Sequence, residues 1–164
     1  MAALTSGTTA PDFALPSMSG GQFQLQSALE KGPVLAAFFK ISCPVCQYAF
    51  PFVDRLYRSY KGRVTVVGIS QNPSKDTAAF IKEFGVTFPV LLDDTNAYPV
   101  SNAYGLTNVP SLFWIAQDGK IEVSSVGWSR KDMETINRLA AESGSQSPQP
   151  LFRSDEQIAD FRAG

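Results

Sequence analysis

The sequence predicts an α/β fold in which a central mixed β-sheet is flanked by helices. Residues 34–39 form a continuous apolar run, which is typical of a strand covered on both faces. Apolar residues then recur at helical spacing over 44–60. The β-branched run 64–69 predicts a second strand, and a helix is expected over 75–84. A chain of 164 residues is long enough for one domain with a hydrophobic core.

The region before the central strand predicts an arm and a hairpin. Residues 1–12 are expected to be a loose N-terminal arm. Residues 13–16 and 22–25 have the pattern of short strands and flank the turn signal Ser19-Gly20-Gly21. The sequence therefore predicts an N-terminal β-hairpin packed beside the sheet.

The third quarter of the chain predicts a short strand over 88–92 and a short helix near 97–104. Asp93 and Asp94 lie between them. A carboxylate in this position caps the first turn of a helix, and no third ligand for a cation lies near it in the sequence. We therefore interpret the acidic pair as a turn and helix cap, and we expect no metal site.

The last part of the domain predicts a β-hairpin and a helix. Pro110 stands just before the apolar run 112–115, where its missing N–H costs the sheet nothing. The turn 117–120 and the strand pattern 121–126 then indicate an antiparallel hairpin. A final core helix is expected to start at Ser129.

The composition divides the chain into a domain over 1–143 and a linker with a tail over 144–164. The linker, 144–150, is rich in Ser, Gln and Pro. Ser154-Asp155-Glu156-Gln157 has the spacing of a capping box and predicts a short tail helix docked on the domain. The alternative is a frayed terminus.

Charge and hydropathy exclude several functions. The net charge is −1 and no basic block is present, which argues against a nucleic-acid partner. No stretch approaches the roughly 18 apolar residues of a membrane span. The first seven residues lack the pattern of a leader, so we expect a cytoplasmic protein, or a periplasmic one if a leader has been trimmed.

The two cysteines of the chain carry the most specific signal. Cys43 and Cys46 flank Pro44 and Val45, at the point where the predicted strand 34–39 is followed by a predicted helix. A C-x-x-C pair beside a βαβ pattern indicates a thioredoxin-like redox motif. The alternatives without redox chemistry are a buried cysteine pair of no chemical consequence, a static disulfide and a zinc site. A closed zinc site needs four ligands, and the chain has no histidine and no third cysteine.

The helix N terminus explains why this position suits redox chemistry. Its unpaired N–H groups and dipole favour a thiolate at Cys43, and the thiolate is the attacking species in disulfide exchange. Cys46 follows nearly one turn later and can resolve a mixed disulfide. Lys40 either stabilises the Cys43 thiolate through its ammonium group or is simply a solvated charge at a strand end. Pro44 suits a first helical turn, and Val45 is available to line a partner groove.

The order of these elements, with Cys43-Pro44-Val45-Cys46 and the later Val109-Pro110-Ser111, resembles the thioredoxin fold. The chain is most similar to the TlpA/ResA-type thiol–disulfide oxidoreductases of the redoxin group, which also holds the AhpC/TSA peroxiredoxins. Weaker marks of this similarity are Ala10-Pro11-Asp12-Phe13, Pro51, Phe88-Pro89-Val90, Tyr104-Gly105 and Asp118-Gly119-Lys120-Ile121.

The resemblance implies a site and its partners. Pro110 is then cis and faces the Cys43–Cys46 pair, and the Val109 backbone hydrogen-bonds a bound protein chain as one strand does another. Residues 71–100 become an inserted strand-helix segment. The implied partners are protein disulfides or dithiols and a recycling reductase, with no cofactor, and we expect a monomer.

Departures from the family patterns define the alternatives. The tryptophan usual before the first cysteine is Ser42 here, and a glutamate common three residues after the second is Ala49. A peroxiredoxin carries proline and a hydroxyl residue where this chain has Ala36 and Lys40, which makes a thiol peroxidase the second interpretation. A non-catalytic Cu(I)-binding module is the third, because soft thiolates select that ion.

Overall fold

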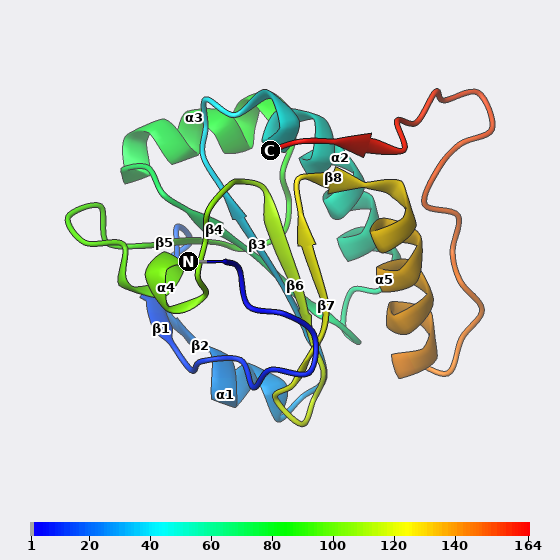
Figure 1. The fold of residues 1–164 in the computed structure, drawn as a ribbon, viewed down its shortest axis with the longest axis horizontal. Helices are drawn as coiled ribbons and strands as arrows, with labels where there is room; N and C mark the ends of the chain where they lie inside the picture. The colour runs from blue at the N-terminus through cyan, green and yellow to red at the C-terminus, as the bar shows by residue number, and fades with distance from the viewer. Residues whose placement is uncertain (1) are drawn as a thin grey trace.

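A five-stranded mixed sheet forms the centre of the computed structural model, which describes residues 2–164 (Figure 1). The strand order is β5-β4-β3-β6-β7. β3 pairs in parallel with β4 on one side and antiparallel with β6 on the other. β5 adds in parallel to β4, and β7 pairs antiparallel with β6. The strands span Val34–Phe39 (β3), Thr65–Ser70 (β4), Val90–Leu92 (β5), Ser111–Ile115 (β6) and Ile121–Val126 (β7).

The central strand β3 is buried on both faces, as its apolar run predicts. Because side chains alternate along a strand, Leu35 and Phe39 enter the core beneath the long helices, whereas Val34 and Phe38 enter a second core on the opposite face. The predicted α/β fold with a mixed sheet between helices is therefore confirmed.

The predicted helices are present with small shifts in their ends. They span Pro44–Ser59 (α2), Ser74–Phe84 (α3), Pro99–Ala103 (α4) and Arg130–Ser143 (α5), and a further short helix that was not predicted spans Leu25–Leu29 (α1). Gly85 ends α3 with φ +63°, a left-handed conformation that glycine adopts without strain. The Ser129 side chain accepts a hydrogen bond from the Asp132 N–H at 3.1 Å and so caps α5.

The N-terminal hairpin is confirmed, but the arm before it is not loose. β1 (Ala14–Pro16) pairs antiparallel with β2 (Gln22–Gln24). The arm forms backbone hydrogen bonds with distant segments: the Gly7 N–H donates to the Ile121 carbonyl at 2.7 Å, and the Ala10 N–H donates to the Gly119 carbonyl at 2.9 Å. The arm is therefore fixed along the β6–β7 hairpin, a partner that lies over a hundred residues away in the sequence.

The predicted tail helix is wrong, because residues 144–164 contain no helix. The carboxylate of Glu156 accepts the Arg153 N–H at 2.8 Å, as in one half of a capping box, but it also binds the Arg55 guanidinium of α2 through both oxygens at 2.6 Å. A helix this short gains too few hydrogen bonds to offset its nucleation. Here the contacts to α2 hold the segment in an irregular conformation instead.

The tail ends in a strand. β9 (Phe161–Arg162) pairs antiparallel with β8 (Trp128–Ser129), the short strand that precedes α5. Before it, Leu151 is buried in the core beside α2 and α5. Figure 1 shows the tail as a long loop beyond α5 that turns back toward the N-terminal end of α2. The division of the chain at residue 143 remains a prediction.

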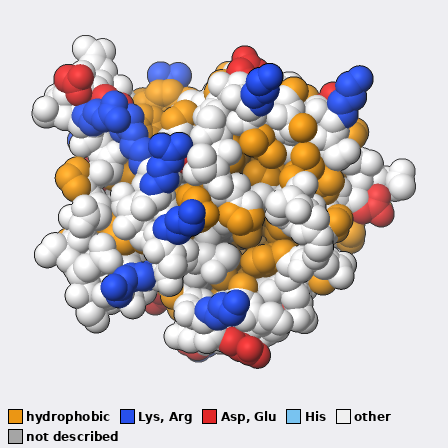
Figure 2. Space-filling view, turned by 180° about the vertical axis from the view of Figure 1, so that it is seen from behind, with side chains coloured by type: hydrophobic (Ala, Val, Ile, Leu, Met, Phe, Trp, Pro, Cys, Tyr) orange, Lys and Arg blue, Asp and Glu red, His pale blue; other side chains and the backbone are white. Residues whose placement is uncertain are grey.

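The surface agrees with the balanced charge of the sequence. On the face seen in Figure 2, hydrophobic side chains gather in one area, and separate Lys and Arg side chains lie around it. Within residues 2–164, no helix is long and apolar enough to cross a membrane.

Candidate active site

Cys43 occupies the N-cap position of α2. Its backbone is extended, with φ −86° and ψ 112°, and Pro44 begins the helix. The Cys43 sulfur accepts a hydrogen bond from the Cys46 N–H at 3.1 Å. This is the interaction that a Ser or Asp cap forms at other helices, with a sulfur in place of the oxygen. The local sequence thus directs a backbone donor of the first turn at this thiol.

Cys46 lies beneath Cys43 and is fully buried. Both cysteines are free thiols in this structure. Burial raises the pKa of the Cys46 thiol well above its ordinary value, and the hydrogen bond with Cys43 adds to the effect. Ala49, one turn after Cys46 at the position where the family resemblance implies a glutamate, is also fully buried. The pair therefore combines a partly exposed sulfur with a deeply buried one.

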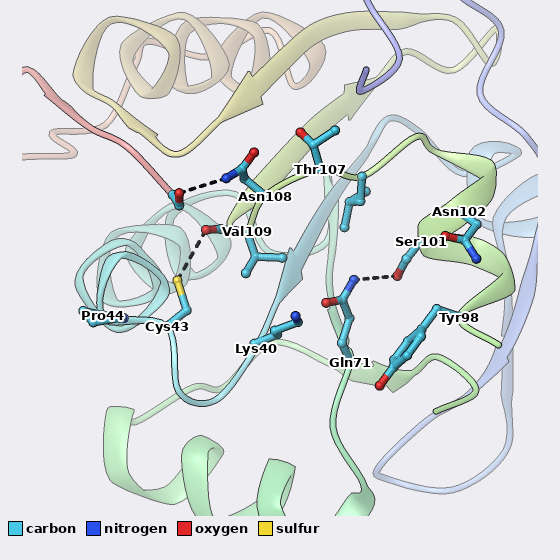
Figure 3. Close-up of a pocket in the computed structure, with 12 residues that line it drawn as sticks. Lys40, Cys43, Pro44, Gln71, Tyr98, Ser101, Asn102, Thr107, Asn108 and Val109 are labelled. Carbon is cyan, nitrogen blue, oxygen red and sulfur yellow. Dashed lines mark hydrogen bonds between the residues drawn. The ribbon is translucent and has the colours of Figure 1, made fainter. Parts of the chain in front are cut away.

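The loop before β6 completes the site from the other half of the chain. The Val109–Pro110 peptide bond is cis, as the family resemblance implies. The Cys43 thiol donates to the Val109 carbonyl oxygen at 3.4 Å (Figure 3). Because these residues are 66 positions apart, the contact depends on the antiparallel pairing of β3 with β6.

A pocket of about 540 Å³ opens beside Cys43. Lys40, Cys43, Pro44, Gln71, Ser101 and Val109 are among the residues that line it. The Gln71 amide donates to the Ser101 hydroxyl at 2.9 Å across the pocket. In Figure 3 the Lys40 side chain extends into the pocket on the Gln71 side. The structure thus brings Lys40 into the same pocket as the thiol.

Asp93 and Asp94, which the sequence predicts to form a turn and a helix cap, have that role. Asp93 is buried and accepts hydrogen bonds from the Val100 and Ser101 N–H groups, at 3.3 and 2.8 Å, at the start of α4. Asp93 therefore fixes the helix that carries Ser101 into the pocket. Among residues 2–164, no three His, Cys, Asp or Glu side chains gather as a metal ligand set.

Several residues beside the site carry no sequence signal. The Asn108 amide donates to the Gly164 carbonyl at 3.0 Å, which places the end of the tail at the pocket (Figure 3). Tyr48 and Trp128 pack edge to face, with ring centroids 5.1 Å apart, beneath the same tail. Only Tyr48 is near the cysteines in sequence, and its position in a helical apolar stripe predicts a core residue and nothing more.

Comparison with known proteins identifies the family. The AhpC/TSA family model matches residues 6–124. The thiol–disulfide oxidoreductase ResA of Geobacillus thermodenitrificans is 32% identical over 132 residues, which cover 79% of this chain and 74% of that protein. A Mycobacterium tuberculosis protein whose name assigns it to the peroxiredoxins is also 32% identical, over 74% of this chain and 84% of its own length.

Solved structures agree on the fold. The thioredoxin domain of a Bacteroides vulgatus thiol–disulfide oxidoreductase superposes with a TM-score of 0.74 at 20% identity, and the match covers 84% of this chain and 99% of that one. The peroxidoxin BcpB of Mycobacterium tuberculosis superposes with a TM-score of 0.67 at 22% identity, over 87% and 97% of the two chains. These two structures therefore show the fold. The chain belongs to the AhpC/TSA family and, within it, to the thioredoxin-like oxidoreductases of the TlpA/ResA type.

Proposed function

We propose that this protein exchanges disulfides with protein partners through Cys43 and Cys46. The observation that carries the proposal is the pairing of a partly exposed sulfur with a buried one at a helix N terminus. The Cys43 sulfur accepts a hydrogen bond from the Cys46 N–H at 3.1 Å. The Cys43 thiol also donates to the Val109 carbonyl, next to the cis proline Pro110. An N–H aimed at the sulfur stabilises the attacking thiolate.

The exchange proceeds in two steps. The Cys43 thiolate attacks one sulfur of the partner disulfide, so that the partner S–S bond breaks and its other sulfur leaves as a thiolate. Cys46 then gives up its proton and attacks the Cys43 sulfur, which releases the partner's second thiolate. The partner gains two electrons and takes up protons, and the enzyme holds a Cys43–Cys46 disulfide. The same steps in reverse oxidise a partner dithiol.

The partner docks in a groove lined by Pro44, Val45, Val109 and Pro110. The Val109 backbone binds an extended partner segment by strand-like pairing, while Val45 and Pro44 contact its side chains. Lys40 stabilises the thiolate from the pocket side. A separate reductase recycles the protein, which acts as a monomer.

Peroxidase and Cu(I)-binding functions have weaker support. The positions at which a peroxiredoxin carries its proline and hydroxyl are Ala36, buried within β3, and Lys40. Without that hydroxyl, a peroxide bound at Cys43 lacks its activating donor. A Cu(I) carrier of this family would use a histidine, and the chain has none.

A trapping experiment tests the proposal. Cys46→Ser removes the resolving thiol, so incubation with a disulfide-bonded protein such as insulin should give a stable mixed disulfide at Cys43, seen by mass spectrometry. Cys43→Ser is the matched control and should give no adduct. Absence of any adduct with Cys46→Ser would refute the exchange mechanism.

The reduction potential decides the direction of exchange. Potentials of C-x-x-C proteins run from about −270 mV for the reductant thioredoxin to about −120 mV for the oxidant DsbA. Equilibration of the Cys43–Cys46 pair with glutathione measures the value. A potential near that of thioredoxin would indicate a reductase of protein disulfides. A potential near that of DsbA would indicate an oxidant that acts in an exported, oxidising compartment.

A further inference from the structure

The end of the tail lies at one edge of the groove in which a partner is proposed to dock, where Gly164 lines the pocket together with Val109 and Cys43. β9 pairs antiparallel with β8, and the Arg130 N–H donates to the Asp160 carbonyl at 2.9 Å. These bonds fix an extended segment beside the loop that precedes β6. In Figure 3 this segment ends at the residue that Asn108 binds, close to Val109 and Cys43.

The tail comes closest to the Val109 backbone at Gly164. The Asn108 amide donates to its carbonyl, and a methyl group on Gly164 would overlap the Val109 carbonyl and crowd Gly127. The Val109 oxygen is the one that also accepts the Cys43 thiol. The tail therefore reaches the backbone group on which partner pairing depends, and it does so in a way that only a residue without a side chain permits.

Side chains around the cysteines hold the tail in place. The Trp128 indole N–H donates to the Ala159 carbonyl at 2.6 Å, and the Ala159 N–H donates to the Tyr48 hydroxyl at 3.1 Å. The Arg162 guanidinium lies 4.3 Å from the centre of the Tyr48 ring, within the range of a cation–π interaction. Tyr48 follows Cys46 by two residues on α2, so the tail is anchored to the active-site helix itself.

We infer that Asp160–Gly164 is an intramolecular occupant of the docking groove, which a partner must displace before it reaches Cys43. The inference rests on the proposed exchange function and adds to it a competing segment. The segment is extended and pairs through its backbone with β8, beside the loop on which an incoming partner strand would pair. Phe161 is 62% exposed, the only large hydrophobic side chain so exposed among residues 2–164, so residues 160–164 have little apolar burial to resist displacement.

The competition also indicates which partners are accepted. Displacing residues 160–164 removes the Arg162 guanidinium from the face of the Tyr48 ring. A partner that replaces this segment must supply an extended segment next to its cysteine and cover the Tyr48 ring with an apolar or guanidinium group. Small disulfides need no such segment and reach the partly exposed Cys43 past the tail.

The test uses proteins that span residues 1–164 and whose docking groove is unchanged. The tail variant Arg162→Ala/Gly164→Ala loses the contact with Tyr48 and adds the methyl group that Val109 excludes. The control Arg138→Ala/Gly144→Ala makes the same chemical changes at α5, where Arg138 pairs with Glu142 and Gly144 ends the helix. The probe is a fluorescently labelled peptide with the sequence of residues 160–164, followed by anisotropy.

We expect the tail variant to bind the peptide about tenfold more tightly than the wild type, a factor that corresponds to about 1.4 kcal/mol. The control should match the wild type. With reduced proteins, insulin reduction by the tail variant should accelerate by a similar factor, while the reaction of Cys43 with Ellman's reagent should change less than about twofold, as expected when only docking is altered.

Each result has one meaning. Equal peptide affinity in the three proteins would overturn the inference, whatever their redox activity. Tighter peptide binding without faster insulin reduction would overturn the claim that the tail controls partner access. If neither insulin reduction nor the Cys46→Ser adduct is seen in any protein, the proposed function is wrong. The peptide affinities would then still test whether residues 160–164 occupy the groove.

Discussion

The two sides of the active site are built in different ways. On one side, residues 43–46 form the first turn of α2, and neighbours in sequence make the contact that defines it, from the Cys46 N–H to the Cys43 sulfur. On the other side, Asn108 meets Gly164 across 56 residues, and Trp128 meets Ala159 across 31. The first side is local structure, whereas the second exists only once the domain has folded.

This difference shows which parts of the sequence determine the reactivity of the cysteine pair and which determine the access of a partner to it. The reactive pair needs a strand, a helix start and two correctly spaced thiols, so a short segment specifies it. Access to the pair depends on the tail and the cis-proline loop, which long-range contacts hold. Changes on the tail side should therefore alter stability and partner access, and changes in the first turn should alter reactivity.

The largest expected effect comes from breaking the anchor of the tail side. Trp128 is fully buried between α2, the tail and α5, so Trp128→Ala leaves a large cavity and an unpaired Ala159 carbonyl. We expect the free energy of unfolding to fall by about 4 kcal/mol. Urea denaturation measures it. Phe161→Ala on the paired strand is the control and should change stability by less than about 0.5 kcal/mol, because that ring is exposed.

The second prediction concerns the two sulfurs of the first turn. Because burial raises the pKa of Cys46, resolution of the mixed disulfide is limited by the small fraction of Cys46 thiolate. The rate of that step should rise about tenfold per pH unit through the neutral range. Stopped-flow measurement of partner release from a preformed Cys43 adduct checks it. A rate that does not change between about pH 6 and 9, a range around and below the ordinary pKa of a thiol, would contradict the assignment of Cys46 as the resolving thiol.

The third prediction separates Lys40 from the backbone donors of the first turn. If the ammonium group stabilises the thiolate across the pocket, Lys40→Ala should slow the alkylation of Cys43 by iodoacetamide at pH 7 by about threefold, the size expected of a screened surface charge. Lys120→Ala, in the distant β6–β7 turn, should leave the rate unchanged. Equal rates for both variants would return Lys40 to the role of a solvated charge.

The smallest effect is expected at the Arg55–Glu156 pair, which ties the tail to α2. The Arg55 guanidinium and the Arg153 N–H lower the pKa of Glu156 to about 2. The stabilisation is therefore complete above the ordinary value near 4.5 and is lost as pH falls from there toward 2. Glu156→Gln should be less stable than the wild type at pH 7, and the difference should shrink across this window.

Urea denaturation at a series of pH values measures that difference. Glu142→Gln removes one partner of an exposed helical pair and serves as the control. A constant difference between the Glu156→Gln variant and the wild type from pH 7 to pH 2 would rule out the ion pair as a tie for the tail.

The sequence by itself determined the sheet, the long helices and the reactive pair. The apolar run of β3, the β-branched residues of β4 and the helix-capping residue Ser129 are local signals, and each element forms where its signal predicts. The position of Cys43 at a helix start follows from the same local pattern. Fold class and candidate chemistry were predictable because neighbouring residues carry both.

Only the tertiary structure decided what surrounds the pair. The N-terminal arm is fixed by Gly119 and Ile121, and the tail is a strand because β8 offers it a pairing edge. The capping-box spacing at Ser154 predicted a helix, but Arg55, about a hundred residues earlier in the chain, binds the carboxylate of Glu156. Weak local preferences yield to such contacts, because a short segment gains more free energy from docking on a folded core than from its own hydrogen bonds.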